Sequence, residues 1–191
     1  GKNVVAVFYG HPGVFACVSH RAIKQAKKEN FTAHMEAGIS AEDCLYADLA
    51  IDPGRTGCIH YETSQFMFYQ RNIDPAAHLI LWQVGLAGDK SLEKFSTGKV
   101  YRQVLVDLLL TSYPGDHHVI LYQAKVLPID TMRAEKIRLT DLVKAELFMH
   151  TTLVIPPSEK MRPNQAILDK LAELDKKELK SSYRPKLTLV L

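Results

Sequence analysis

Short apolar runs that end in glycine, proline or a polar residue alternate with amphipathic segments along most of this 191-residue chain. Runs rich in β-branched and aromatic residues predict strands over residues 4–9, 32–35, 58–61, 66–69, 78–84, 119–123 and 151–155. Apolar residues at a spacing of three to four predict helices over residues 19–30, 40–49, 97–113, 140–148 and 163–179. The alternation predicts an α/β fold with a mixed sheet, and such sheets bind ligands beyond the carboxyl ends of their strands.

Two of the predicted helices begin at serine residues that can cap free backbone N–H groups. Ser19 precedes a stripe that contains Ile23 and Ala26, and Ser40 precedes acidic residues that suit the positive end of a helix dipole. The last predicted helix has an apolar stripe that we expect to face inward, made of Ile167, Leu168, Leu171 and Leu174.

The charge distribution argues against a nucleic-acid partner. The chain has 24 Lys and Arg residues against 21 Asp and Glu residues, which gives a net charge of +3. Residues 159–186 hold eight basic and five acidic side chains and so account for this whole excess. Nucleic-acid binders usually carry a basic patch or stripe, whereas this basic segment is typical of a solvated helix. We therefore expect no nucleic acid as a partner.

The cysteines and the apolar runs indicate the cellular compartment of the protein and whether it enters a membrane. Cys17, Cys44 and Cys58 are odd in number and include no C-x-x-C pair, so the sequence predicts neither a disulfide framework nor a zinc site. Asp107 interrupts the longest apolar candidate for a membrane span, at residues 104–110. We expect a cytoplasmic protein that has no membrane partner.

Several catalytic fingerprints are absent from the sequence. The loop at residues 10–13, Gly-His-Pro-Gly, matches neither the dinucleotide-binding pattern nor the P-loop. The sequence contains no H-E-x-x-H or G-x-S-x-G motif, and the adjacent His117 and His118 would point to opposite faces of a strand. These absences argue against NAD or ATP chemistry, metal-dependent hydrolysis and serine catalysis.

Glycine or polar residues interrupt the apolar pattern at the ends of three predicted strands. They are the loop at residues 9–15, the segment 38–41 before a helix, and Gln83 in a strongly apolar run. Each alone has an ordinary explanation as a turn, a helix cap or a satisfied core amide. Together they would let the backbone approach a ligand closely at successive strand ends.

These same segments resemble the borosin peptide N-methyltransferases. The resemblance extends to about residue 174, and its most specific block begins with Gly-Ile-Ser-Ala-Glu-Asp-Cys-Leu at residues 38–45 and ends at residue 53. The strand-end loops are shared with the wider tetrapyrrole methylase superfamily. The resemblance implies a two-lobed tetrapyrrole methylase-like fold with mixed sheets. We place the N-terminal lobe at residues 1–77, the C-terminal lobe at 78–158, and a helix and tail at 159–191.

The resemblance also implies a cofactor, S-adenosylmethionine, with S-adenosylhomocysteine as its product and no metal ion. The site would lie between the two lobes. The residues that the resemblance assigns to the cofactor are Tyr9, His11, Val14, Phe15, Ser40, Ala41, Gln83, Tyr122, Ala124, Thr151 and Thr152.

Methylation of a peptide amide is difficult because the nitrogen lone pair is delocalised into the carbonyl group. Tyr9 matches a tyrosine of the family's active site, and we interpret it as the candidate catalytic residue, which could hydrogen-bond or deprotonate the amide through water. The alternative role for Tyr9 is that of a phenol packed against the cofactor.

The family's first strand, its catalytic arginine and its further tyrosines precede the region that this sequence matches, so we expect the sequence to be a fragment. The resemblance also implies a homodimer. It also implies a precursor peptide as substrate, and we expect a separate molecule because residues 187–191 are too short for a methylated core.

Three other functions remain open at this stage. A corrin or porphyrin methyltransferase would share the fold. A peptide- or cofactor-binding protein without turnover would bind S-adenosylmethionine and form no product. Ribose methylation of RNA is a weaker alternative, because the balanced charge argues against it, and salt-dependent binding of RNA would revive it.

Overall fold

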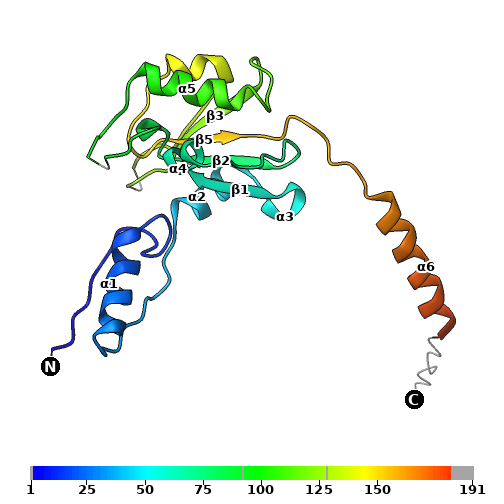
Figure 1. Cartoon of the computed structure of the whole chain (residues 1–191), viewed down its shortest axis with the longest axis horizontal. Coiled ribbons are helices and arrows are strands. Elements are labelled where there is room, and N and C mark those ends of the chain that lie inside the picture. Colours follow the sequence, from blue (N-terminus) through cyan, green and yellow to red (C-terminus); the bar gives the residue numbers. More distant parts are fainter. Residues whose placement is uncertain (1, 92, 128, 182–191) are drawn as a thin grey trace. The chain divides into compact units, whose positions relative to one another are not determined.

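The computed structural model describes residues 2–91, 93–127 and 129–181 (Figure 1). Its contacts divide the chain into two units, Gly1–Glu159 and Lys160–Leu191. The first unit contains a mixed sheet, and the second contains one long helix.

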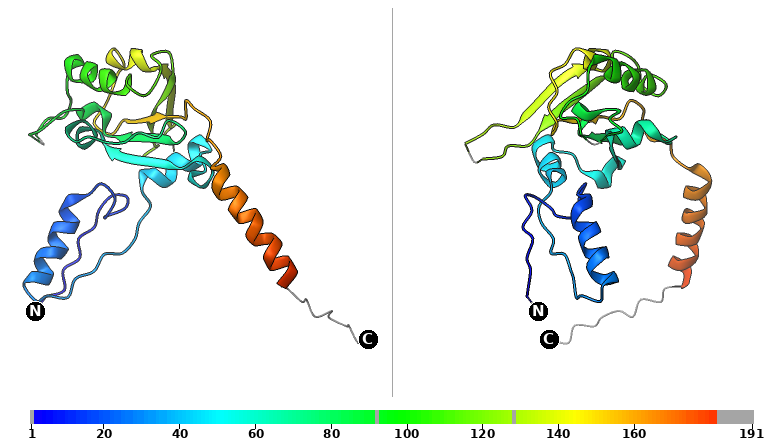
Figure 2. Two further views of the ribbon diagram at one scale, coloured as in Figure 1. Left: turned by 45° about the vertical axis from the view of Figure 1, so that its right-hand side comes forward. Right: turned by 60° about the vertical axis from the view of Figure 1, so that its left-hand side comes forward.

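The sheet of the first unit has five strands in the described residues, in the order β1-β2-β5-β3-β4. Strands β1 (Cys58–Glu62) and β2 (His78–Trp82) are parallel, whereas β5 (Thr152–Ile155) is antiparallel to both β2 and β3 (His118–Gln123). At the edge, β4 (Arg133–Arg138) pairs antiparallel with β3, and this hairpin is drawn in yellow-green in Figure 2. The predicted α/β class with a mixed sheet is confirmed.

One face of the sheet carries the larger hydrophobic core. It is covered by α4 (Thr63–Phe68), α5 (Lys99–Leu109) and the short 3-10 helix η2 (Leu139–Val143). The helix α5 lies on this side in both Figure 1 and Figure 2. Fully buried members of this core include Leu79, Leu81, Leu105, Leu109 and Leu121.

The opposite face packs against α2 (Ala41–Leu49). Leu45 of this helix is fully buried in a second cluster, whose other buried members are Ile80, Trp82, Tyr122 and Val154. Ser40 caps the helix as predicted: its Oγ accepts a hydrogen bond from the N–H of Glu42, and Asp43 completes a capping box. The cap therefore fixes where α2 begins over the strand ends.

The strands predicted at residues 4–9 and 32–35 do not form within the part of the chain that the structure describes. These residues are irregular, and Val4, Val5 and Val7 are between 83% and 91% exposed. Strand propensity needs a neighbouring strand to satisfy the backbone and cover the side chains, and none pairs with these residues here.

The helix between those two segments, α1 (Cys17–Lys28), begins two residues earlier than predicted. Its N-cap is Ala16, and Ser19 lies in the first turn. The Ser19 hydroxyl donates to the carbonyl oxygens of Pro12 and Ala16 rather than capping N–H groups. Ile23 and Ala26 are half-buried, as the predicted stripe requires.

Three further expectations were wrong. Residues 66–68 are not extended but belong to α4, because the Glu62 carboxylate accepts from the N–H groups of Ser64 and Gln65 and so starts a helix. Residues 140–148 contain η2 followed by turns rather than an α-helix. Strand β4 was missed because the side chains of an exposed edge strand are mostly charged and break the apolar pattern.

Two short helices complete the first unit. Helix α3 (Pro53–Thr56) begins at Asp52, whose side chain accepts from the N–H of Gly54. The strand predicted over residues 78–84 ends at Trp82, because the 3-10 helix η1 (Val84–Leu86) begins just after Gln83.

The predicted lobe boundary at residues 77 and 78 stays a prediction. Strand β1, from the expected N-terminal lobe, pairs with β2, from the expected C-terminal lobe, over five residue pairs. The boundary at residue 159 lies next to the division between the two compact units.

The second unit contains α6 (Gln165–Ser181). The stripe predicted to face inward is half-exposed, at 48–51% for Ile167, Leu168, Leu171 and Leu174. An amphipathic helix buries its stripe only against another element, and the described residues of this unit contain no second helix or strand. Among the described helices of the whole chain, none combines the length and apolarity that a membrane span needs.

Candidate functional site

The glycine–proline loop at residues 10–13 lies directly against the segment that precedes α2. A Cβ atom at Gly38 would lie 2.6 Å from the carbonyl oxygen of Gly10, so only glycine permits this approach. The loop is closed by its own hydrogen bonds, because the Gly13 N–H donates to His11 Nδ1 at 3.0 Å and His20 Nε2 lies 2.9 Å from the Gly13 oxygen. The loop at residues 9–15 and the segment at residues 38–41 therefore form one structural unit.

The loop reaches the sheet through an aromatic contact. The ring centroid of Phe15 lies 5.4 Å from that of Trp82, with a tilt of 40° between the rings. Phe15 has a positive φ of 50° and is 48% exposed, so one part of its ring is free to contact a ligand. Trp82 is the last residue of β2, and the contact thus brings the loop to a strand's carboxyl end.

Gln83 has left-handed backbone angles, with φ 58° and ψ 43°. A non-glycine residue in this region costs on the order of 1–3 kcal/mol and tends to mark a functional position. The Gln83 side chain is half-buried. The backbone thus turns sharply directly beyond β2, where α/β sheets bind ligands.

Thr151 holds two neighbouring segments at this same end of the sheet. Its carbonyl oxygen accepts from the N–H of Val84 at 2.9 Å. Its Oγ1 accepts from Gln123 Nε2 at 2.6 Å and from the N–H of Phe148 at 2.9 Å. Both lone pairs of this hydroxyl are therefore used, and Thr151 is fully buried, so its role is to hold these two segments in place.

Tyr122 joins β3 to α2 from within the second core. Its ring is 1% exposed, and its hydroxyl donates to Asp48 Oδ2 at 2.7 Å. Burial, together with the hydrogen bond to this carboxylate, raises the pKa of Tyr122, so the phenol stays neutral. Thr152 is its register partner on β5 and is also buried, and Ala124 follows at half-burial.

Ser40 marks the start of α2, and its side chain is 9% exposed. The Asp43 carboxylate accepts from the Ser40 N–H at 2.7 Å and from its Oγ at 3.0 Å, and these bonds lower the pKa of Asp43. Ala41 is exposed in the first turn. The N–H groups at this helix end favour a negatively charged or polar ligand group.

The structure gathers some of the predicted site residues more closely than others. An aromatic contact, hydrogen bonds and strand register bring together five of them around the ends of β2 and β3 and the beginning of β5: Phe15, Gln83, Tyr122, Thr151 and Thr152. His11 and Val14 are half-buried within the loop itself, where the Val14 N–H donates to the His11 carbonyl oxygen. Tyr9, the candidate catalytic residue, is 84% exposed.

Sequence reasoning missed a polar network beneath Trp82. The indole N–H of Trp82 donates to His60 Nδ1 at 3.1 Å, and His60 Nε2 lies 2.7 Å from the Tyr46 hydroxyl. The Tyr46 hydroxyl in turn donates to Glu42 Oε1 at 2.9 Å. One signal could have indicated the pairing: Glu42 and Tyr46 lie one helical turn apart, at the i and i+4 spacing that brings side chains together.

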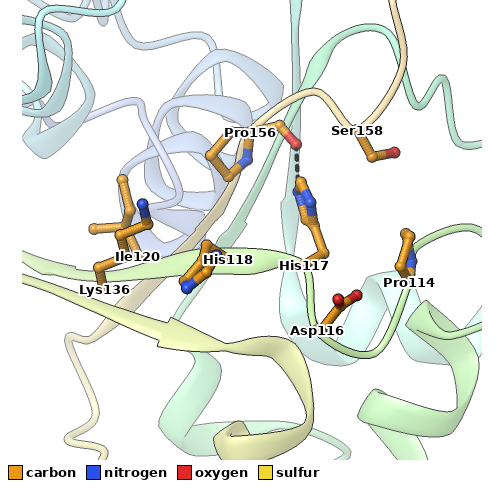
Figure 3. A pocket seen from close by; sticks show the side chains of 8 residues that line it. All are labelled: Pro114, Asp116, His117, His118, Ile120, Lys136, Pro156 and Ser158. Carbon is orange, nitrogen blue, oxygen red and sulfur yellow. Dashed lines mark hydrogen bonds between the residues drawn. The ribbon is translucent and has the colours of Figure 1, made fainter.

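A separate cavity of about 590 Å³ lies at the other end of β3 (Figure 3). Its lining consists of Pro114, Asp116, His117, His118, Ile120, Lys136, Pro156 and Ser158. His117 Nε2 lies 2.9 Å from the carbonyl oxygen of Pro156, as the dashed line in Figure 3 marks. None of the residues assigned to the cofactor line this cavity. In the residues that the structure describes, no group of three or more His, Cys, Asp or Glu side chains could hold a metal ion.

No protein-family model matches the sequence, but curated relatives do. A methyltransferase/ribosomally synthesized cyclic peptide gymnopeptides precursor of Gymnopus fusipes is 44% identical over 177 residues, which are 90% of this chain and 42% of that protein. A methyltransferase/type I borosin cyclic peptide precursor of Coprinopsis marcescibilis is 40% identical over 192 residues, covering 93% of this chain and 48% of that protein. The chain is a homologue of the borosin methyltransferase/precursor proteins. The chain spans less than half of the length of those relatives.

Solved structures confirm the predicted fold of the chain. The methyltransferase CobJ has a TM-score of 0.56 at 17% identity, covering 86% of this chain and 68% of that chain. A uroporphyrin-III C-methyltransferase from Thermus thermophilus, complexed with S-adenosylhomocysteine, has a TM-score of 0.51 at 12% identity, over 77% of this chain and 62% of that chain. The predicted resemblance and the tetrapyrrole methylase-like fold are therefore both confirmed.

Proposed function

We propose that this chain is part of an S-adenosylmethionine-dependent methyltransferase that N-methylates backbone amides of a ribosomal precursor peptide. The observation that carries the proposal is the identity of 40–44% with borosin methyltransferase/precursor proteins over at least 90% of the chain. Those relatives' names join an enzyme and a precursor, so they support a peptide as the substrate. A separate precursor molecule stays our prediction.

The sheet end described above fits the cofactor. When bound, S-adenosylmethionine supplies the methyl group from its sulfonium centre. The half-exposed ring of Phe15 offers a surface for the adenine, and the αL turn at Gln83 gives access to backbone groups. Thr151 is buried below this surface, and its hydroxyl oxygen holds Gln123 and the backbone of Phe148 in place through two hydrogen bonds. The remaining assigned residues are Tyr9, His11, Val14, Ser40, Ala41, Tyr122, Ala124 and Thr152.

Positioning of the amide is the main task of the protein's own residues. Well-oriented groups contribute about 7–11 kcal/mol to catalysis, and a general base adds a further ~10²–10⁴-fold. Tyr9 follows the exposed segment at residues 4–8 and precedes the loop, so its phenol is accessible to a substrate amide. We assign to Tyr9 the hydrogen bond or water-mediated proton transfer from the amide N–H.

A corrin or porphyrin substrate is the alternative that the fold would permit. The tetrapyrrole enzymes are only 10–17% identical to the chain and so indicate the fold alone. The borosin relatives at 37–44% identity favour the peptide.

We also propose a homodimer in the cytoplasm. The exposed apolar side chains of the N-terminal segment, such as Val5, Val7 and Ile39, support association with another surface. The free thiols of Cys17, Cys44 and Cys58 suit a reducing compartment. Light scattering after size-exclusion chromatography measures the oligomeric state.

The decisive experiment is incubation of the purified protein with S-adenosylmethionine and a candidate precursor peptide, followed by intact and fragment mass spectrometry. We expect mass gains in whole methyl steps that fragmentation places on backbone nitrogens. Gln83→Ala should weaken cofactor binding and slow the gain, whereas Gln65→Ala, on the exposed surface of α4, should not. Cofactor binding without any methylated peptide would favour the small-molecule methylase or the non-catalytic binder instead.

A further inference from the structure

A directed chain of hydrogen bonds connects α2 with the end of β2 through His60. The chain runs from the Trp82 indole to His60 Nδ1, from His60 Nε2 to the Tyr46 hydroxyl, and from that hydroxyl to Glu42. The three distances are 3.1, 2.7 and 2.9 Å. None of these four side chains belongs to the residues assigned to the cofactor.

The chemistry of the indole sets every direction in this chain. An indole N–H can only donate, so His60 Nδ1 must be an unprotonated acceptor. The imidazole is then the neutral tautomer that carries its hydrogen on Nε2 and donates it to the Tyr46 oxygen. The Tyr46 hydrogen is thereby left for Glu42. All donors and acceptors of the chain are matched only while His60 is neutral.

The surroundings of His60 favour this neutral state. Its side chain is 17% exposed, its ring lies nearly parallel to that of Trp82 with the two centroids 6.0 Å apart, and burial lowers its pKa. The titratable groups that face it are Glu42 and Tyr46 from α2 and Cys58, two residues away on the same face of β1. The Glu42 carboxylate, at 3.6 Å, acts in the opposite direction and raises the pKa of His60.

Trp82 transmits this arrangement to the proposed cofactor site. Trp82 is 7% exposed, and its ring contacts both Phe15, at the end of the glycine–proline loop, and His60. It also directly precedes Gln83, whose αL backbone begins the turn beyond β2. A rotation of the indole would therefore displace two of the residues that the cofactor needs.

We propose that His60 is a positioning residue, which holds Trp82 through its Nδ1 atom and thereby keeps Phe15 and Gln83 in place for the cofactor. The identity of the cofactor rests on the proposed function above, whereas the orientation of Trp82 does not. Protonation of His60 would set an N–H against the indole N–H, so acid would release Trp82 and weaken cofactor binding.

Intrinsic fluorescence can report the environment of Trp82, because Trp82 is the single tryptophan of the chain. Its fluorescence, recorded from pH 8 to pH 4, should show one transition below the ordinary pKa of histidine at ~6.5. His60→Asn keeps an oxygen acceptor near the Nδ1 position and cannot be protonated, so it should keep the neutral-pH spectrum and lose the transition. Glu42→Gln should move the transition to lower pH, because a charge that favours the imidazolium is removed.

The affinity for S-adenosylmethionine tests whether the position of Trp82 keeps Phe15 and Gln83 in place for the cofactor. His60→Leu removes the acceptor and leaves a buried indole N–H without a partner, so we expect the Kd to rise about tenfold. His60→Asn should stay within about threefold of the wild type. His118→Asn, at an exposed position on β3, is the matched control and should leave both the spectrum and the Kd unchanged. Circular dichroism of each variant shows whether it is folded. If His60→Leu does not fold, the measurements on His60→Asn decide whether His60 holds Trp82.

Two results would overturn the inference. One is a fluorescence transition that persists in His60→Asn, which would show that His60 does not control Trp82. The other is an unchanged Kd in a folded His60→Leu. A wild-type protein that binds no S-adenosylmethionine would instead contradict the proposed function, and the fluorescence titration would still decide whether His60 holds Trp82.

Discussion

The hydroxyl of Tyr122 donates a 2.7 Å hydrogen bond to Asp48, across 74 positions of sequence, and so ties β3 to α2. The two partners differ in burial, because Tyr122 is 1% exposed whereas Asp48 is only half-buried. Water can therefore replace a lost partner for Asp48 more easily than for Tyr122.

This difference predicts an asymmetric cost of mutation. Asp48→Ala leaves a buried phenol without an acceptor and should lower the free energy of unfolding by about 1–3 kcal/mol. Tyr122→Phe leaves a hydrated carboxylate and should cost about 0.5–1.5 kcal/mol. Urea unfolding followed by circular dichroism measures both values. Equal costs, or a larger cost for Tyr122→Phe, would contradict this account of the pair.

Substitution of Gly38 should disturb the loop that carries Phe15. A methyl group there would lie 2.6 Å from the Gly10 carbonyl oxygen, which is a backbone atom and cannot rotate away. We expect Gly38→Ala to cost about 1–3 kcal/mol in the free energy of unfolding and to weaken S-adenosylmethionine binding. Gly98→Ala is the control, since a Cβ there meets nothing within 4 Å. Thermal unfolding and calorimetric titration test the two variants together, and a Gly38→Ala protein indistinguishable from Gly98→Ala would refute the steric argument.

Thr151 should tolerate serine but not valine. Thr151→Val keeps the shape and removes the acceptor of Gln123 Nε2 and of the Phe148 N–H, so two donors in a buried region lose their partner. We expect a loss of about 1–3 kcal/mol in the free energy of unfolding, together with weaker cofactor binding. Thr151→Ser retains the hydroxyl and should stay near wild-type affinity. A normal Kd in Thr151→Val would remove this residue from the proposed site.

Much of this site could be predicted from the sequence because its signals are local. The Ser40 cap, the apolar run of β2 and the glycine–proline loop each depend on neighbouring residues, and the structure shows the cap and the strand as expected. The interaction of His60 with Trp82 is different, since 22 positions separate the two residues and their contact depends on the parallel register of β1 and β2. No pattern in the sequence encodes that register.

The errors in the fold have a related cause. Strand β4 is stabilised by its backbone pairing with β3 rather than by an apolar face, so its composition concealed it. Conversely, residues 4–9 have the composition of a buried strand but no pairing partner in the described residues. In both cases the pairing of backbone groups, which the sequence does not specify locally, decided the outcome.

Stability should fall as the pH is lowered from neutral, because two partly buried histidines resist protonation. Burial holds the pKa of both His60 and His78 below the ordinary value of 6.5. The unfolded chain therefore binds more protons than the native protein as the pH drops through 6.5, and stability is lost from there down to each native pKa. We expect His78→Asn to flatten the stability curve between pH 7 and pH 5. The control is His34→Asn, whose side chain is 77% exposed, and equal curves for both variants in urea titrations would contradict the prediction.

Substitution of Tyr9 separates a role in the methylation step from a role in cofactor binding. Its side chain is 84% exposed beside the loop, so Phe at this position should change neither the fold nor the packing of the sheet. If the phenol assists proton removal from the amide, Tyr9→Phe should lower the single-turnover methylation rate by about 10²–10⁴-fold and leave the Kd for S-adenosylmethionine unchanged. A phenol that only packs against the cofactor would give little change in rate, since the ring is retained in Phe, and Tyr9→Ala would then raise the Kd. Tyr69→Phe, at an exposed tyrosine just after α4, controls for the loss of a surface hydroxyl. Rates from mass spectrometry at saturating cofactor, set beside affinities from calorimetry, assign Tyr9 to one role or the other.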